Sequence, residues 1–208
     1  MTLISSTALL SALLVAVMLH PIPARAEDGT PALARDIPEP SQCKVQPRPL
    51  AFFEGLASTP GTDEVSSPEA TATTTPLTPP TEGRVNEATL AAITATIREL
   101  VACRNANDLL RTDALYTDAF FFRQIAVSGP PNLEFLTERA TPVPLEEHMW
   151  AGIEAIRGVR FLPDGRVSGI VDLHLPSEDV TFAFVFAPVG DRWLVDGETV
   201  LSRSSAGG

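Results

Sequence analysis

The chain has 208 residues, of which 15 are basic and 26 are acidic, so its formal net charge is −11. Every acidic residue follows position 26 and only Arg25 among the basic residues precedes it, so a chain cut there would carry 14 − 26 = −12. Because so negative a chain would be repelled by nucleic acids and by anionic lipid surfaces, we expect neither as a partner.

Residues 1–26 are typical of a secretory signal peptide. An almost unbroken apolar run of eleven residues, Leu9 to Leu19, is followed by the sequence Ala24-Arg25-Ala26. An apolar run of this length before a small-residue site favours cleavage after Ala26 and is too short to remain as a spanning helix. We therefore expect a secreted or extracytoplasmic protein without a stable membrane anchor once the leader is removed.

The two cysteines, Cys43 and Cys103, both follow the predicted cleavage site. An even number of cysteines in an oxidising compartment predicts a disulfide between them. Cys43 lies in an N-terminal arm, residues 27–56, that has several apolar side chains between Gln42 and Leu56. We expect the disulfide to hold this arm across an apolar face of the main domain.

Residues 57–83 have the composition of a flexible linker. Eight of these 27 residues are threonine, five are proline and three are serine. Such a segment has too little apolar surface to offset the entropy of ordering, so we expect it to be extended and disordered. It separates the arm from a folded domain at 84–202, and residues 203–208 are interpreted as a polar tail.

Two helices are predicted at the start of the folded domain. Asn86 is a suitable N-cap, and apolar residues then recur at helical spacing along one stripe: Leu90, Ile93, Ile97, Leu100 and Val101. The spacing places Cys103 on the flank of this helix, where the arm can reach it, rather than deep in the core. A second, shorter helix is predicted from Asp108 to about Tyr116, with Asn107 as its cap.

The residues that follow are predicted to be less regular. Three consecutive aromatic residues, Phe120 to Phe122, suggest a chain that passes between two packed layers. Residues 128–144 are rich in proline, so we expect an irregular crossing with one helical turn around Leu133 to Glu138. A short helix is predicted at Leu145 to Met149.

The segment from Ala151 to Leu201 predicts four antiparallel strands. Pro163-Asp164-Gly165 and Pro188 to Asp191 favour tight turns, and Ser177 to Asp179 is a short polar joint. In the third strand the phenylalanines at 182, 184 and 186 alternate with Ala183, Val185 and Ala187, which predicts a central strand covered on both faces. The fold class is therefore α+β, with two N-terminal helices packed on a curved antiparallel sheet of four or more strands.

Three stretches resemble the nuclear transport factor 2-like, or SnoaL-like, superfamily. They are Leu100 to Asp108, Leu115 to Phe120, and the ending Gly190-Asp191-Arg192-Trp193-Leu194-Val195-Asp196, which is similar to a Gly-x-x-Trp closing strand. The resemblance covers about residues 85–201 and implies an exported bacterial member with a cone-shaped fold. It implies no single function, because the superfamily includes isomerases, dehydratases, cyclases and transport factors. The proline-rich stretch at 128–144 departs from the helix and strand that the family would have there.

Asp172 and His174 are the candidate catalytic residues. At positions i and i+2 of one strand they share a face, so a carboxylate and an imidazole lie side by side as proton abstraction requires. Members of the resembling family use Asp and His inside the cone. The alternative is a pair that faces solvent on the outside of the sheet.

The candidate ligand-binding residues are chosen from the expected cone: Tyr116, Phe120, His148, Trp150 and Trp193. Tyr116 is the only tyrosine and would offer a hydroxyl donor, and His148 with Trp150 would close the pocket mouth. Each has an alternative as a packing or solvent-facing residue.

Metal and cofactor signals are weak. Asp196 and Glu198 are a spaced carboxylate pair without a third ligand, and the histidines and disulfide-forming cysteines leave no zinc set. No glycine-rich phosphate loop or Gly-x-Ser-x-Gly sequence occurs, so we expect no cofactor and no metal.

Three functions remain open from the sequence. The first is an exported, non-catalytic domain of the nuclear transport factor 2-like type that binds a small apolar ligand or a protein partner. The second is a small-molecule lyase or isomerase that uses Asp172 and His174 as an acid–base pair. The third is a structural module that forms a homodimer through the open face of its sheet.

Overall fold

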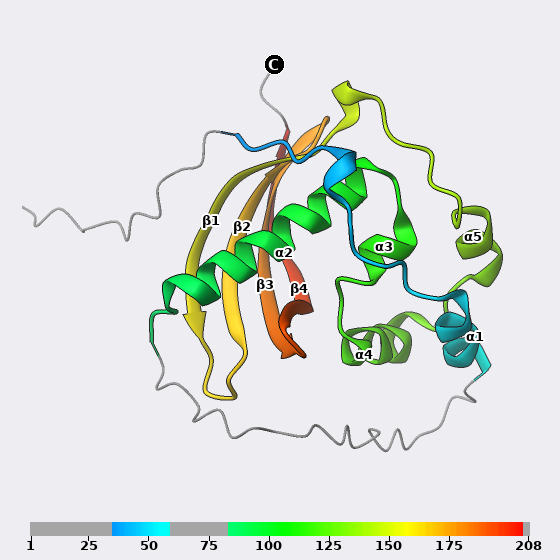
Figure 1. Cartoon of the computed structure of the whole chain (residues 1–208), viewed down its shortest axis with the longest axis horizontal. Coiled ribbons are helices and arrows are strands. Elements are labelled where there is room, and N and C mark those ends of the chain that lie inside the picture. Colours follow the sequence, from blue (N-terminus) through cyan, green and yellow to red (C-terminus); the bar gives the residue numbers. More distant parts are fainter. Residues whose placement is uncertain (1–34, 59–82, 206–208) are drawn as a thin grey trace, which may run out of the picture.

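The computed structural model describes residues 35–58 and 83–205, so the predicted signal peptide and most of the predicted linker lie outside the described residues. The described part is α+β, and its strands form one antiparallel sheet in the order β1-β2-β3-β4 (Figure 1). These strands are β1 (Gly152–Phe161), β2 (Val167–His174), β3 (Glu178–Val189) and β4 (Arg192–Ser205). The predicted four-strand meander is confirmed, although β4 continues past position 202 into the predicted tail.

Glycines close two of the three hairpins. Gly165 between β1 and β2 has φ 83°, and Gly190 between β3 and β4 has φ 61°. Left-handed backbone of this kind favours glycine because it has no Cβ to clash, which is why both predicted turns are correct. The β2–β3 turn lies at residues 175–177, slightly before the predicted joint, because Asp179 already pairs with His174 in the sheet.

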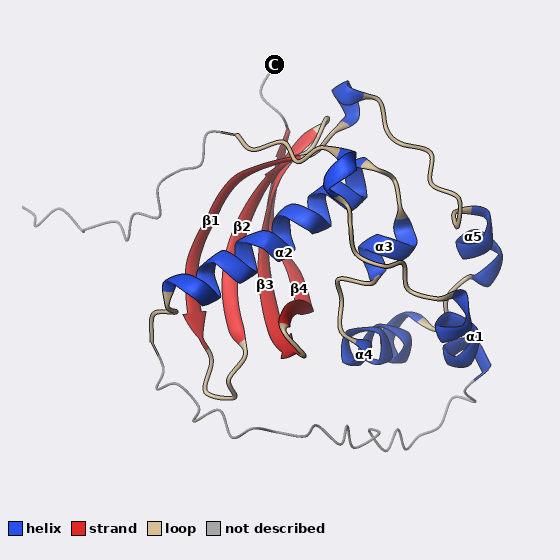
Figure 2. Cartoon of the chain, in the orientation of Figure 1, coloured by secondary structure: helices blue, strands red, loops and turns tan. Residues whose placement is uncertain are grey.

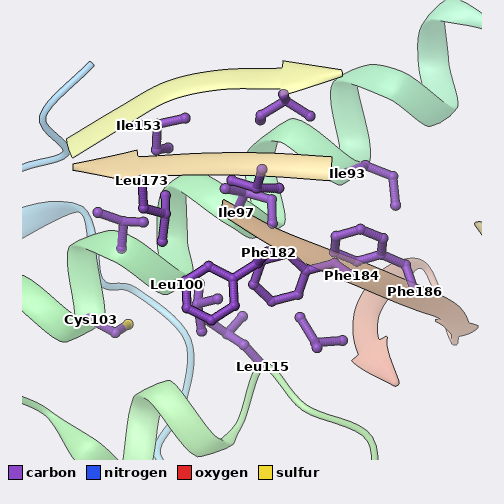
Figure 3. Close-up of a cluster of buried hydrophobic side chains, with 14 of the residues drawn as sticks. Ile93, Ile97, Leu100, Cys103, Leu115, Ile153, Leu173, Phe182, Phe184 and Phe186 are labelled. Atoms are coloured by element: carbon purple, nitrogen blue, oxygen red, sulfur yellow. The ribbon is translucent and has the colours of Figure 1, made fainter. Parts of the chain in front are cut away.

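Helix α2 (Glu87–Asn105) lies across one face of the sheet, which we call the inner face (Figure 1). Its N-cap is Asn86, as predicted, with the side chain accepting a hydrogen bond from the Thr89 backbone N–H. The predicted apolar stripe is buried apart from Leu90, which is partly buried, and it packs in one cluster with Phe182, Phe184 and Phe186 of β3 (Figure 3). This contact between a helix stripe and a row of phenylalanines forms the main core.

The two faces of β3 differ. The inner phenylalanines are buried, whereas Ala183, Val185 and Ala187 on the opposite, outer face are only half-buried. The prediction that β3 is central is confirmed, but the prediction that it is covered on both faces is wrong. Two of the three outer side chains are alanines, which expose so little apolar surface that the outer face needs no second layer.

The predicted disulfide joins Cys43 to Cys103. The arm is held to α2 by further contacts, since Glu99 Oε1 accepts hydrogen bonds from the backbone N–H groups of Lys44 and Val45. Cys103 has 0% exposure, so its predicted place on the flank, outside the core, is wrong. It is buried because the arm covers it, which the helix periodicity alone does not reveal.

Helix α3 (Leu109–Asp113) is shorter than predicted and begins one residue later. Its N-cap is Asp108, while the predicted cap, Asn107, has φ 53°. Helix α3 ends at Asp113 because the residues that follow form backbone hydrogen bonds to β4. The Val195 N–H donates to the Leu115 carbonyl and the Thr117 N–H donates to the Val195 carbonyl, both at 2.9 Å.

The three consecutive phenylalanines lie in a helix, α4 (Asp118–Ser128), and not in a layer crossing as predicted. Successive residues of a helix point about 100° apart, so the three rings reach different neighbours. Phe121 packs edge-on against Phe52 and Phe53 of α1 (Leu50–Ser58), a helix of the arm that the sequence analysis did not identify.

The arm helix α1, together with α4 and α5 (Leu133–Glu138), lies beside the sheet (Figure 2). A second, smaller hydrophobic cluster joins α1, α3 and α5, with partly buried side chains of α4 packed against it. Its buried members are Phe53, Leu56, Leu110 and Leu136. The helical turn predicted at Leu133 to Glu138 is confirmed. Two short 3-10 helices, η1 (Pro40–Gln42) and η2 (Glu147–Met149), complete the described elements, and η2 replaces the short helix predicted at 145–149.

Within residues 35–58 and 83–205, no helix is both long and apolar enough to cross a membrane. The disulfide fits an oxidising, extracytoplasmic location.

We expect removal of the disulfide to destabilise the fold strongly. The cysteines are separated by 60 residues, and cross-linking a loop of that size is worth roughly 4 kcal/mol in the chain-entropy estimate. Replacing both cysteines with serine should therefore lower the free energy of unfolding by about 2–4 kcal/mol, as measured by urea denaturation. An unchanged unfolding midpoint, or free thiols in the native protein, would show that the arm is not tethered in this way.

Candidate functional site

Asp172 and His174 share the outer face of β2, but each is bonded to a different neighbour. Asp172 accepts hydrogen bonds from Arg157 Nε at 2.9 Å and from Thr181 Oγ1 at 2.7 Å. His174 Nδ1 lies 2.7 Å from Asp179 Oδ1. The structure places the two candidates on one face, as predicted, but no hydrogen bond or ion pair joins them to each other among the described residues.

Asp172 is held in its charged form. Partial burial raises its pKa, but the hydrogen bonds from Arg157 and Thr181 outweigh this and keep the pKa below its ordinary value. A general base needs a pKa near the working pH, and a carboxylate neutralised by an arginine is a poor proton acceptor. The surroundings of Asp172 therefore favour a structural role.

The candidate ligand-binding residues lie in different surroundings. The Tyr116 and Phe120 rings are neighbours, with centroids 4.6 Å apart. Trp193 packs against Phe161, and its backbone carbonyl accepts a hydrogen bond from Thr96 Oγ1 at 2.7 Å. These three residues belong to, or pack against, the main core.

The other two candidates lie just before β1. Trp150 Nε1 donates to the Leu145 carbonyl at 2.9 Å, which fixes the ring against its own segment. His148 is exposed, with Nδ1 3.3 Å from Glu146 Oε2. None of the five candidates lines the groove described next, although Leu145, Met149 and Ala151 beside them do.

A groove of about 500 Å³ opens where the end of α2 meets α3, α5, the segment before β1 and the β2–β3 turn. Its lining is mostly apolar in area and includes two arginines. The lining residues are Arg104, Asn105, Asn107, Asp108, Leu109, Thr112, Phe135, Arg139, Leu145, Met149, Ala151, Leu175, Pro176 and Ser177.

Asn105 fixes one wall of this groove. Its side chain is 1% exposed and makes three hydrogen bonds to backbone groups. Nδ2 donates to the carbonyls of Pro38 and Ala151, and Oδ1 accepts from the Ala151 N–H. The amide thus ties the end of α2 to the arm and to the start of β1. Because all its polar atoms are satisfied, this wall is rigid.

Arg104 and Arg139 are the basic residues of the groove. Both are exposed, and neither forms an ion pair with another described residue. The Arg139 guanidinium lies over the Phe135 ring, 5.5 Å from its centroid. Asp108, the acidic residue of the lining, instead caps α3 and lies 3.6 Å from Arg111. The groove therefore offers two guanidinium groups that form no ion pair within residues 35–58 and 83–205.

A polar cluster that the sequence analysis missed involves Asp113. Burial raises the pKa of its carboxyl group to about 7, although the nearby Arg48 guanidinium lowers it. Tyr116 donates its hydroxyl to Glu198 Oε2 at 2.8 Å, and burial together with the Glu198 charge raises the tyrosine pKa well above its ordinary value. One feature of the sequence could have indicated a buried Asp113. It lies three residues after Leu110, which is buried, and therefore near the same face of the helix.

The carboxylates of Asp196 and Glu198 do not form the cation site considered from their spacing. Asp196 is buried and bonded by Thr117 at 2.6 Å and by Arg166 at 2.9 Å, whereas Glu198 bonds to Tyr116. Burial raises the pKa of Asp196, but these hydrogen bonds outweigh it and hold the pKa below its ordinary value. Two side chains committed to separate partners cannot share a metal ion without breaking both sets of bonds.

Comparisons with protein families, with curated proteins and with solved structures gave no match for this chain. The groove and the side chains around it are therefore the basis on which a function is inferred.

We expect Asp113 to make stability fall as pH rises. Its pKa is raised in the folded chain, so between about pH 4 and pH 7 the folded state binds a proton that the unfolded state has lost. The contribution of Asp113 to stability should therefore decline through this window, with a slope that approaches about 1.4 kcal/mol per pH unit, the limit for one proton. The Asp113→Asn variant should lose this slope and be more stable than the parent at pH 8.

Urea unfolding at intervals from pH 4 to pH 8 measures this effect. Asp191→Asn is the matched control, because Asp191 is exposed in the β3–β4 turn. If Asp113→Asn keeps the slope of the parent, the carboxyl group of Asp113 is ionised throughout this range and the assignment is wrong.

Proposed function

We propose that this protein is an exported, non-catalytic binding domain that holds a small apolar molecule with an anionic end. The observation that carries the proposal is the groove of about 500 Å³, in which Arg104 and Arg139 stand among apolar side chains without carboxylate partners in the described chain. Ligand sites in proteins are typically concave, largely apolar and supplied with a few polar groups that fix orientation.

The apolar part of the groove supports binding of a hydrocarbon or aromatic body. Two large side chains of the lining remain exposed, Phe135 at 46% and Met149 at 43%. Leu109, Leu145 and Leu175 extend the same lining. A ligand that covers these groups gains roughly 25 cal/mol for each Å² of apolar surface it removes from water.

The arginines support an anionic end. The chain is acidic overall, with a net charge of −11, so most of its surface repels anions. Arg104 and Arg139, which form no ion pair with any described residue, create a local exception. A guanidinium matches the geometry of a carboxylate or sulfonate. Arg139 is partly ordered before any ligand binds, because its guanidinium lies over the Phe135 ring.

Two observations support a member of the nuclear transport factor 2-like superfamily, with its cone-shaped fold. A long helix lies across the inner face of a curved four-stranded sheet (Figure 1), and Trp193 of the closing strand packs onto the main core. The signal-peptide pattern at 1–26 and the Cys43–Cys103 disulfide together support export.

A binding role is favoured over the lyase or isomerase alternative. Asp172 is occupied by Arg157 and Thr181, and neither it nor His174 lines the groove. Of the acidic residues in the described part of the chain, only Asp108 lines the groove, and it caps a helix. No carboxylate of the groove is thus placed to remove a proton from a bound ligand.

A pair of fluorescent probes tests the proposal. The first is 8-anilinonaphthalene-1-sulfonate, an apolar anion, and the second is N-phenyl-1-naphthylamine, which has the same ring system without the charge. We expect both to bind at one site. The double variant Arg104→Ala/Arg139→Ala should weaken the sulfonate about tenfold, as the loss of charge-assisted contacts predicts, and leave the neutral probe unchanged.

Two variants serve as controls. Arg160→Ala removes an exposed arginine from β1, which bonds weakly to Ser168 Oγ at 3.4 Å, and should change neither affinity. Met149→Asp places a charge in the apolar lining and should weaken both probes. The proposal fails if the double arginine variant binds the sulfonate as tightly as the parent, or if Met149→Asp leaves both affinities unchanged.

A further inference from the structure

A second group of side chains gathers on the outer face of the sheet, and none of its members lines the groove. Glu154 of β1, His174 of β2 and Asp179 of β3 each place one potential ligand atom so that all three atoms lie within 4.8 Å of one another. They come from three adjacent strands, so the sheet itself fixes their backbone separations. Within residues 35–58 and 83–205 this is the only such group of three.

The local backbone explains the convergence. His174 and Asp179 are directly opposite in the pairing of β2 with β3, next to the turn that joins these strands. On β1 the pairing register shifts between Ile153 and Ala155, which makes Glu154 the extra residue of a bulge. A bulge frees a residue from the strict alternation of a strand and redirects its side chain. Glu154 is thereby placed within reach of the His174 ring.

We propose that Glu154, His174 and Asp179 form a zinc-binding site on the outer face of the sheet. An imidazole nitrogen and two carboxylate oxygens are ligands that Zn²⁺ accepts, and a water molecule would complete four-coordination. The ligand atoms of such a site lie about 3.3 Å apart when each is about 2.0–2.1 Å from the metal. The three candidate atoms lie within 4.8 Å of one another, and small rotations of these partly exposed side chains would bring them to this spacing.

The ligand set also discriminates between cations. Ca²⁺ and Mg²⁺ are bound by six or more oxygen atoms, which two carboxylates and an imidazole do not supply. Zn²⁺ binds more tightly than Mn²⁺ or Fe²⁺ to nitrogen and oxygen ligands of this kind. At present His174 Nδ1 lies 2.7 Å from Asp179 Oδ1, and the metal ion would replace this contact.

Arg35 is the competitor for this site. Its Nη2 lies 3.0 Å from Glu154 Oε1, and both side chains are partly exposed, at 49% and 37%. An exposed ion pair contributes only about 0–1 kcal/mol, so a divalent cation would displace the guanidinium. Removing Arg35 should therefore strengthen metal binding, an effect opposite to that of removing a ligand.

The experiment is a calorimetric titration of the full chain, made without an affinity tag and stripped of metal, with zinc chloride. We expect one ion per chain with a dissociation constant in the micromolar range. His174→Ala should weaken binding at least thirtyfold, and Asp179→Asn at least tenfold. Arg35→Ala should tighten it about threefold, consistent with the loss of a weak competing ion pair.

The chain supplies its own matched control. His148 lies 3.3 Å from Glu146, which makes an exposed histidine–carboxylate pair that lacks a third ligand. His148→Ala should therefore leave the zinc affinity unchanged. Nuclear magnetic resonance of the two rings separates the sites without any variant, because zinc should shift the His174 resonances and leave those of His148 in place.

Three outcomes would overturn the proposal. One is the absence of binding below millimolar zinc. Another is that calcium binds as tightly as zinc and that this binding is unchanged in His174→Ala. That result would indicate only a general attraction of the acidic surface for cations. The last is a shift of the His148 resonances without a shift of His174. None of the three residues lines the groove. A negative zinc titration would therefore not bear on ligand binding in the groove, and negative probe titrations would not bear on the zinc site.

Discussion

The packing of the apolar stripe of α2 onto the phenylalanine row of β3 is the constraint on which the rest of the structure depends. It buries Ile97 and Leu100 with Phe184 in one cluster, and it fixes where the C-terminal end of α2 lies over the sheet. From that end, Cys103 binds the arm covalently and Asn105 bonds the arm and the start of β1. The groove exists because these segments meet at one point.

Features whose cause is local were predictable from the sequence. The stripe that begins at Leu90, the cap at Asn86 and the hairpin turns at Gly165 and Gly190 depend on neighbouring residues alone. The predictions failed where tertiary neighbours decide. Helix α4 was missed because its aromatic side chains pack against Phe52 and Phe53 of the arm, which lie far away in the sequence. The burial of Cys103 was missed because the same arm covers it.

The candidate site shows the same division. The i, i+2 spacing correctly placed Asp172 and His174 on one face of a strand. It could not identify their hydrogen-bond partners, because these depend on how the neighbouring strands pair with β2. In the folded chain Arg157 neutralises Asp172, while His174 meets Asp179 across the hairpin and Glu154 from a bulge. The groove is lined by five separate segments of the chain, so no local sequence pattern predicts it. His174, selected from the sequence as an acid–base partner, thus belongs to the group of three residues proposed as a metal site.

The contact between α2 and β3 is measured most directly by nuclear Overhauser spectroscopy on protein with labelled methyl and aromatic groups. We expect cross-peaks from the Ile97 and Leu100 methyl groups to the rings of Phe182 and Phe184, with slow amide exchange along both elements. Absence of these cross-peaks in a folded sample, with rapid exchange along α2, would contradict the arrangement on which the groove depends.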